Sequence, residues 1–222
     1  MATQLDLQEQ EQLDNLKAFW KQYGDLITWL LVIVLGAFAA WNGWNTYQRS
    51  QGVKASAMFD QLEMAVQAGD ADRAARVFGD LKERYPGTAY AQQGALLAAR
   101  VQQDKGQAEA ARASLAWAAE NGKDDAYRAA AKLRLAGLLA DAKEYDKALE
   151  QLAGIKDKSF EALAADRRGD VLLAQGKRDE ARAAYQAAWK AMDATLDYRQ
   201  LIDAKLASLG AAPPAAASGV AP

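Results

Sequence analysis

Carboxylates are the first groups to consider for chemistry in this chain, because its 222 residues include no histidine and no cysteine. Without imidazole and thiol groups the chain lacks thiol nucleophiles, disulfides, and the metal sites and proton transfers that use those side chains. Asp166 and Asp170 stand four residues apart, beside Arg167 and Arg168. Such charges on one helix usually form local salt bridges, worth about 0.2–0.5 kcal/mol each. We therefore expect a solvated charged face there, not a general acid–base pair.

The other acids on the expected inward-facing helices have the same interpretation. The sequence shows no glycine-rich phosphate loop, no nucleophile elbow and no cluster with metal-ligand spacing. We predict that the protein is not an enzyme and needs no cofactor. A membrane-anchored hydrolase that uses carboxylates is the less favoured alternative. The remaining acids, which we also expect to be solvated, are Glu63, Asp104, Asp141 and Glu144.

The composition predicts an all-α protein that does not bind nucleic acid. Hydrophobic residues make up 51% of the chain, much of that share is alanine, and there are 4 prolines. Alanine has the highest helix propensity, and its small side chain lets helices approach closely. The net charge is -2, so no basic surplus is available to neutralise a run of phosphates.

A single transmembrane helix is predicted at residues 26–48, because no charged side chain occurs between Leu26 and Gln48. At about 1.5 Å rise per residue this stretch spans roughly 34 Å, enough to cross a hydrocarbon core of about 30 Å. Aromatic rings prefer the level of the headgroups. The residues expected at the two membrane interfaces are Trp29 at one end and Trp41, Trp44 and Tyr47 at the other.

Two other interpretations of this segment are weaker. A cleaved signal peptide would use the small residues around Phe38, but such peptides have a basic leader, whereas residues 1–25 contain five acids against Lys17 and Lys21. A buried core helix would not carry so many tryptophans. The orientation is undecided by charge, because Arg49 and Lys54 after the span balance the two lysines before it.

Residues 1–25 form an acidic, amphipathic leader. Leu13, Leu16, Trp20 and Tyr23 follow one another at spacings of three and four, which places them on one face of a helix. We expect this helix to lie on the membrane surface just before the span. A short docking motif for a cytosolic partner is the alternative.

Residues 49–209 are predicted to form about four helical hairpins of a tetratricopeptide-like (TPR-like) solenoid. Four segments share a turn residue, an alanine five residues later, and a large apolar residue four beyond that. Successive segments are 33 to 37 residues apart, close to the tetratricopeptide period of about 34. An ordinary alanine-rich helical bundle is the alternative. The turn residues are Gly69, Gly106, Lys143 and Gly176; the alanines are Ala74, Ala111, Ala148 and Ala181; the large residues are Phe78, Leu115, Leu152 and Tyr185.

The end of the chain completes this array. Tyr198–Leu209 is helix-periodic and is expected to cap the last hairpin, and residues 210–222, which are Ala, Pro, Gly, Ser and Val, are expected to form a disordered tail. The concave face of such an array is an extended binding surface. The residues expected to contact a protein or an extended polypeptide there are Arg100, Gln103, Leu133, Asp141, Leu163, Asp166 and Asp170.

Together these features resemble the YfgM-type ancillary subunits of the SecYEG translocon. The likeness covers nearly residues 8–209 and is carried by LKAFWKQYGD in the leader, GAFAAWNGWNTY at the end of the span, and AADRRGDVLLAQGKRDEARAAYQAAW in the last hairpin. The resemblance implies a bacterial inner-membrane protein with a cytoplasmic N-terminus and repeats in the periplasm. Its implied partners are the translocon, the membrane-anchored peptidyl-prolyl isomerase PpiD, and periplasmic chaperones or exported polypeptides.

The function expected on this basis is a non-enzymatic scaffold, accessory to the translocon, that links exported proteins to periplasmic chaperones through its repeats. The alternative is a membrane-anchored scaffold or regulatory adaptor whose repeats face the cytosol. Family members have no catalytic residues to carry over, and the Ala/Pro tail is not part of the family pattern.

Overall fold

The computed structural model describes residues 7–211, and α-helices occupy most of that range without any β-strand. Residues 1–6 of the leader and residues 212–222 of the expected tail lie outside the described residues. The chain divides into two compact units at Ser50. The expected all-α class is confirmed. The helices are α1 (Leu7–Gln67), α2 (Ala71–Arg84), α3 (Ala89–Asp104), α4 (Ala108–Asn121), α5 (Asp125–Asp141), α6 (Tyr145–Ala153), α7 (Glu161–Ala174), α8 (Arg178–Ala191) and α9 (Tyr198–Ser208), with a 3-10 turn at Lys158–Phe160.

Helix α1 runs without interruption through the expected leader, the expected span and the first helix of the repeats. The sequence contains no proline before Pro86, so nothing between Leu7 and Gln67 removes a backbone donor or forces the helix to end. The limits that we set at residues 25 and 48 are therefore changes of side-chain chemistry along one helix.

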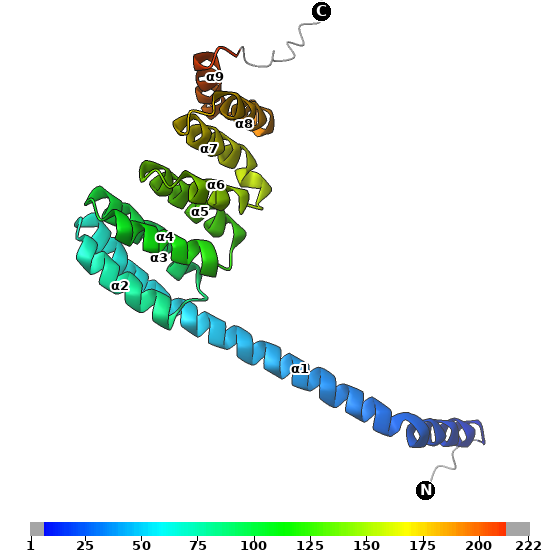
Figure 1. Ribbon diagram of the computed structural model, residues 1–222. Helices are drawn as coiled ribbons and strands as arrows, with labels where there is room; N and C mark the ends of the chain where they lie inside the picture. The colour runs from blue at the N-terminus through cyan, green and yellow to red at the C-terminus, as the bar shows by residue number, and fades with distance from the viewer. Residues whose placement is uncertain (1–6, 212–222) are drawn as a thin grey trace, which may run out of the picture. The chain divides into compact units, whose positions relative to one another are not determined.

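In the second unit, from Gln51 onward, successive helices pair as antiparallel hairpins that stack one on the next, which Figure 1 shows from cyan to red. The last part of α1 packs with α2, where Leu62 and Phe78 share one buried cluster. Helices α3 and α4, α5 and α6, and α7 and α8 form the following pairs, and α9 packs on α8.

Each hairpin turns at the residue that the repeat pattern predicts. The backbone is left-handed at Gly69 (φ 65°), Gly106 (φ 73°), Lys143 (φ 64°) and Gly176 (φ 79°). In every case the amide of the turn residue bonds a carbonyl three residues back, and the next amide bonds a carbonyl five back, at 2.8–2.9 Å. This pair of bonds satisfies carbonyls at the end of the first helix. Lys143 makes the same bonds, although a side chain is disfavoured at positive φ.

The shared alanines and large residues form the contact between the two helices of each hairpin. All four alanines are completely buried, and the four large side chains are buried beside them. In the last hairpin the approach is closest at Gly169, where an added Cβ would lie 2.4 Å from the nearest ring carbon of Tyr185. Glycine is therefore required at this position of α7.

Helix α9 closes the open end of the array. Ile202 and Leu206 are fully buried in the cluster that also contains Tyr185. Gly210 and Ala211, which we had expected in the disordered tail, instead form the turn that ends α9, with Gly210 at φ 74° and the Ala211 amide bonded to Leu206.

We predict that Gly169→Ala destabilises the repeat unit by about 1–3 kcal/mol, because the new methyl group would overlap the ring of Tyr185 in a filled core. Unfolding of the full chain in detergent, followed by circular dichroism against urea, measures the change. Gly137→Ala is the matched control, since an added Cβ there meets nothing within 4 Å. We expect the control to gain about 0.5–1 kcal/mol from helix propensity; equal effects of the two changes would contradict the close packing at Gly169.

Candidate partner-binding surface and apolar helix

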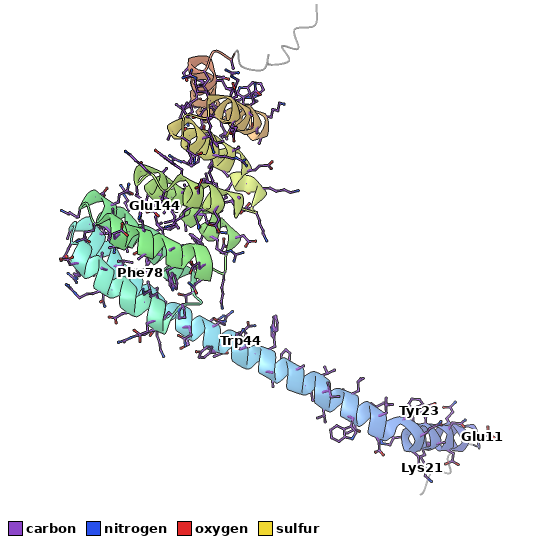
Figure 2. The ribbon with its side chains drawn as sticks, in the orientation of Figure 1. Glu11, Lys21, Tyr23, Trp44, Phe78 and Glu144 are labelled. Carbon is purple, nitrogen blue, oxygen red and sulfur yellow. The ribbon has the colours of Figure 1, made fainter. Side chains whose placement is uncertain are left out.

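The middle of α1 is an apolar helix whose side chains are uncovered. Within the described residues, α1 is long and apolar enough to cross a membrane, by length and composition. The aromatic residues that we expected at the interfaces are all more than half exposed: Trp29, Trp41, Trp44 and Tyr47. Figure 2 shows Trp44 pointing away from the helix axis. So much uncovered apolar surface is incompatible with contact to water alone.

The two threonine hydroxyls in this stretch are satisfied within the helix. The Thr28 hydroxyl donates to the Gly24 carbonyl at 2.7 Å, and the Thr46 hydroxyl donates to the Asn42 carbonyl at 2.9 Å. Such bonds remove the cost of placing a hydroxyl in an apolar environment. The segment can therefore enter lipid without an unpaired threonine donor.

The expected partner-binding residues come from the first helices of the hairpins. Arg100 and Gln103 are exposed on α3, Asp141 is exposed on α5, and Leu133 and Leu163 are half-buried on α5 and α7. Helix α5 contacts both α3 and α7. The structure therefore places these side chains on three adjacent helices.

Two hydrogen bonds hold α3 against α5 at this surface. The Gln93 amide donates to the Tyr127 hydroxyl, and the Arg134 guanidinium donates to the Leu96 carbonyl at 3.5 Å. The surface therefore combines half-buried apolar side chains with exposed polar groups, which suits recognition of a polypeptide.

The structure corrects the prediction that Asp166 and Asp170 lie on a solvated charged face. Asp166 is only 2% exposed, so it does not lie on a solvated face. The Lys205 ammonium donates to both oxygens of Asp166 at 2.8 Å and to Asp170 at 2.7 Å. The cation that the two acids share comes from α9, and the expected local salt bridge forms only between Arg167 and Asp170, at 3.7 Å. The prediction failed because α9 covers this part of α7.

Two tyrosine hydroxyls complete this network. Tyr198 donates to Asp166 at 2.8 Å, and Tyr185 donates to Asp170 at 2.9 Å. Burial, and then the bond to Asp166, raises the pKa of Tyr198 to about 12. Burial and the bond to Asp170 likewise raise the pKa of Tyr185 above its usual range. Both phenols are therefore protonated donors at neutral pH. The network holds α9 in place through hydrogen bonds and ion pairs.

Our sequence prediction missed Tyr198, Lys205 and Tyr185 as members of this network. Tyr198, Ile202 and Lys205 are spaced by four and three residues, so they share the face of α9 that meets α7 and α8. That spacing identifies the covered face of α9, but it contains no information about which residue of another helix lies opposite.

A second group of charges joins α4 to α6. Glu144, labelled in Figure 2, lies 2.8 Å from Arg112 and is also paired with Lys147. Hydrogen bonds from Lys147 and then from Arg112 lower the pKa of Glu144. This carboxylate therefore stays ionised at neutral pH. Within the described residues, no three Asp or Glu side chains are grouped to hold a metal ion.

A groove of about 540 Å³ lies on the repeats between α6, α7 and α8. Most of its wall is alanine, and it contains no nucleophile with an adjacent base. Arg168 and Glu180 are its charged residues. The groove can accept small apolar side chains, and this composition fits binding better than catalysis.

We predict that Lys205→Met lowers the free energy of unfolding by about 3 kcal/mol, because the Asp166 carboxylate would be left buried without its cation. Urea unfolding of the full chain in detergent measures this loss. Exposed Lys190 provides the control, and Lys190→Met is expected to change stability by less than about 0.5 kcal/mol. Adding Asp166→Asn to the Lys205 variant should restore part of the loss; no restoration would show that the ion pair is not what holds α9.

Comparisons with known proteins agree with this geometry. Residues 17–211 match the family of tetratricopeptide repeat-like domains. A protein of Neisseria gonorrhoeae named "Ancillary SecYEG translocon subunit" is 33% identical over 207 residues, which cover 91% of this chain and 98% of the relative.

Proteins of the same name from Escherichia coli and Haemophilus influenzae are each 29% identical to this chain. The Escherichia coli match covers 90% of this chain and 96% of the relative, and the Haemophilus influenzae match covers 82% and 89%. The resemblance inferred from the leader, the span and the last hairpin is thus confirmed, and the chain belongs to the family of ancillary SecYEG translocon subunits, which is built on a tetratricopeptide repeat-like domain.

Proposed function

We propose that this protein is a non-enzymatic scaffold of the bacterial inner membrane, accessory to the SecYEG translocon. The observation that carries the proposal is the match over 91% of the chain to a subunit of that name, which includes both the apolar helix and the repeats. Residues 26–48 cross the bilayer in this proposal, with the N-terminus in the cytoplasm and the repeats in the periplasm.

The repeats hold polypeptides through the first helices of the hairpins. Arg100, Gln103 and Asp141 supply exposed polar groups of both charge signs, and Leu133 and Leu163 supply apolar contacts. Such a mixed surface fits an extended polypeptide better than an anionic tail. Asp166 and Asp170 contribute indirectly, since they hold α9 against α7. The partners in this proposal are exported polypeptides, periplasmic chaperones and a PpiD-like isomerase, in addition to the translocon.

A repeat unit facing the cytosol is the second candidate, because the basic residues balance across the span. Lys17 and Lys21 precede it, and Arg49 and Lys54 follow it. The positive-inside tendency therefore favours neither side.

Cysteine labelling distinguishes the two orientations, because the chain has no cysteine of its own. We expect Glu120→Cys, on an exposed position of α4, to react with a membrane-impermeant maleimide once the outer membrane is opened. Ala18→Cys in the leader should react only after the inner membrane is broken. The reverse pattern would establish the cytosol-facing scaffold.

Photo-crosslinking tests the proposed binding surface. A photoreactive amino acid at Gln103, on the exposed face of α3, is expected to cross-link to translocon subunits or exported polypeptides in intact cells. The same amino acid at Glu120, which is also exposed but lies on the second helix of its hairpin, serves as the control. Equal cross-linking from both positions would contradict a binding surface on the first helices.

A further inference from the structure

The part of α1 before the apolar span has an uncovered apolar face. Leu13 and Tyr23 are each 42% exposed, Leu16 is 62% exposed, and Trp20 is 58% exposed. Phe19 is 50% exposed and its ring lies 5.1 Å from that of Tyr23. At 100° per residue these five side chains occupy one side of the helix. No described residue of the first unit covers them.

The opposite side of the same helix is charged. Five exposed residues lie there: Glu11, Asp14, Lys17, Lys21 and Asp25. Figure 2 labels Glu11 and Lys21 on this segment together with Tyr23. Asp14 and Lys17 form an exposed ion pair at 3.1 Å. Lys17 borders the apolar face, where its alkyl stem can lie along apolar material while the ammonium group stays in water.

Helix α1 also bends where this segment meets the span. Figure 1 shows the change of direction in the blue part of the helix, and Figure 2 places Tyr23 beside it. The Thr28 hydroxyl bonds the Gly24 carbonyl at 2.7 Å, a contact that bends helices. Trp20 lies against Gly24, where an added Cβ would be 3.1 Å from the indole nitrogen. The leader and the span therefore follow different directions.

Covalent continuity limits what can cover the apolar face. Leu13 precedes Leu26 by about 13 residues, so at about 1.5 Å per residue it lies within roughly 20 Å of the point where the span enters the membrane. A helix with an apolar face, a charged face and a tether of this length is held next to the lipid surface at all times. The surface that such a face fits is the boundary between headgroups and acyl chains.

We propose that residues 11–25 lie in this boundary, with Leu13, Leu16, Trp20 and Tyr23 toward the acyl chains and the charged face toward water. The leader contains five acids and two lysines, so its affinity for lipid comes from apolar contact and not from attraction to anionic headgroups. The inference goes beyond the scaffold function and holds for either orientation of the repeats.

Spin labels on single cysteines in the full chain test the proposal. The variants Leu16→Cys and Tyr23→Cys report on the apolar face, and Asp14→Cys and Ala18→Cys report on the charged face. In vesicles of neutral phosphatidylcholine, labels on the apolar face should collide several-fold more with oxygen, which concentrates in lipid, than with a water-soluble nickel chelate. Labels on the charged face should show the reverse preference.

Three results would overturn the proposal. Equal access of the nickel chelate to both faces would place the leader in water. Protection of the apolar face only when the translocon is present in the same vesicles would make it a protein-docking motif. A requirement for anionic lipid would assign the binding to charge.

A matched pair of double substitutions separates apolar contact from added charge. With the reporter at Leu13→Cys, Leu16→Asp with Trp20→Asp should abolish the oxygen preference. Asn15→Asp with Gln22→Asp adds the same charge on the other side of the helix and should leave the preference unchanged. Loss of the preference in both pairs would contradict a role for the apolar face.

Discussion

Alanine packing inside each hairpin is the constraint on which the repeat unit depends. Ala74, Ala111, Ala148 and Ala181 have no exposed surface, and each brings two antiparallel helices close enough for one larger side chain to fill the remaining space. A hairpin built this way still has an apolar outer face, which only the next hairpin can bury. Stacking is therefore required by the packing, and the last hairpin needs a closing element.

Helix α9 supplies that closure by combining apolar and ionic contacts. Ile202 and Leu206 cover the end of the core, while Lys205 reaches the buried carboxylate of Asp166. A buried ion pair adds little net stability compared with apolar packing, but it tolerates very few alternative positions of the helix. The pair of acids that suggested chemistry in the sequence thus sets how the cap is seated on α7.

Local spacing predicted the hairpins, whereas long-range contacts could not be predicted. Gly69, Gly106 and Gly176 predicted the turns because glycine is favoured in the left-handed conformation. Alignment of the repeats then placed Lys143 at the same position. No comparable sequence signal predicted the surroundings of Asp166, since its partner Lys205 lies 39 residues later on another helix. The helix limits inside α1 were also unpredictable, because its apolar and polar segments share one uninterrupted hydrogen-bond ladder.

The left-handed lysine has a consequence for how the array opens. The third hairpin combines Lys143 with a second helix of 9 residues, against 14 in each of α2, α4 and α8. In a stack held by nearest-neighbour contacts, cooperativity breaks at the unit with the smallest local stability. The buried cluster of this hairpin, which includes Ala148 and Leu152, lies between one that contains Phe78 and one that contains Tyr185, and we expect local opening to begin at this middle cluster. The hairpins next to the apolar helix can then open locally without releasing the last hairpin, which carries α9.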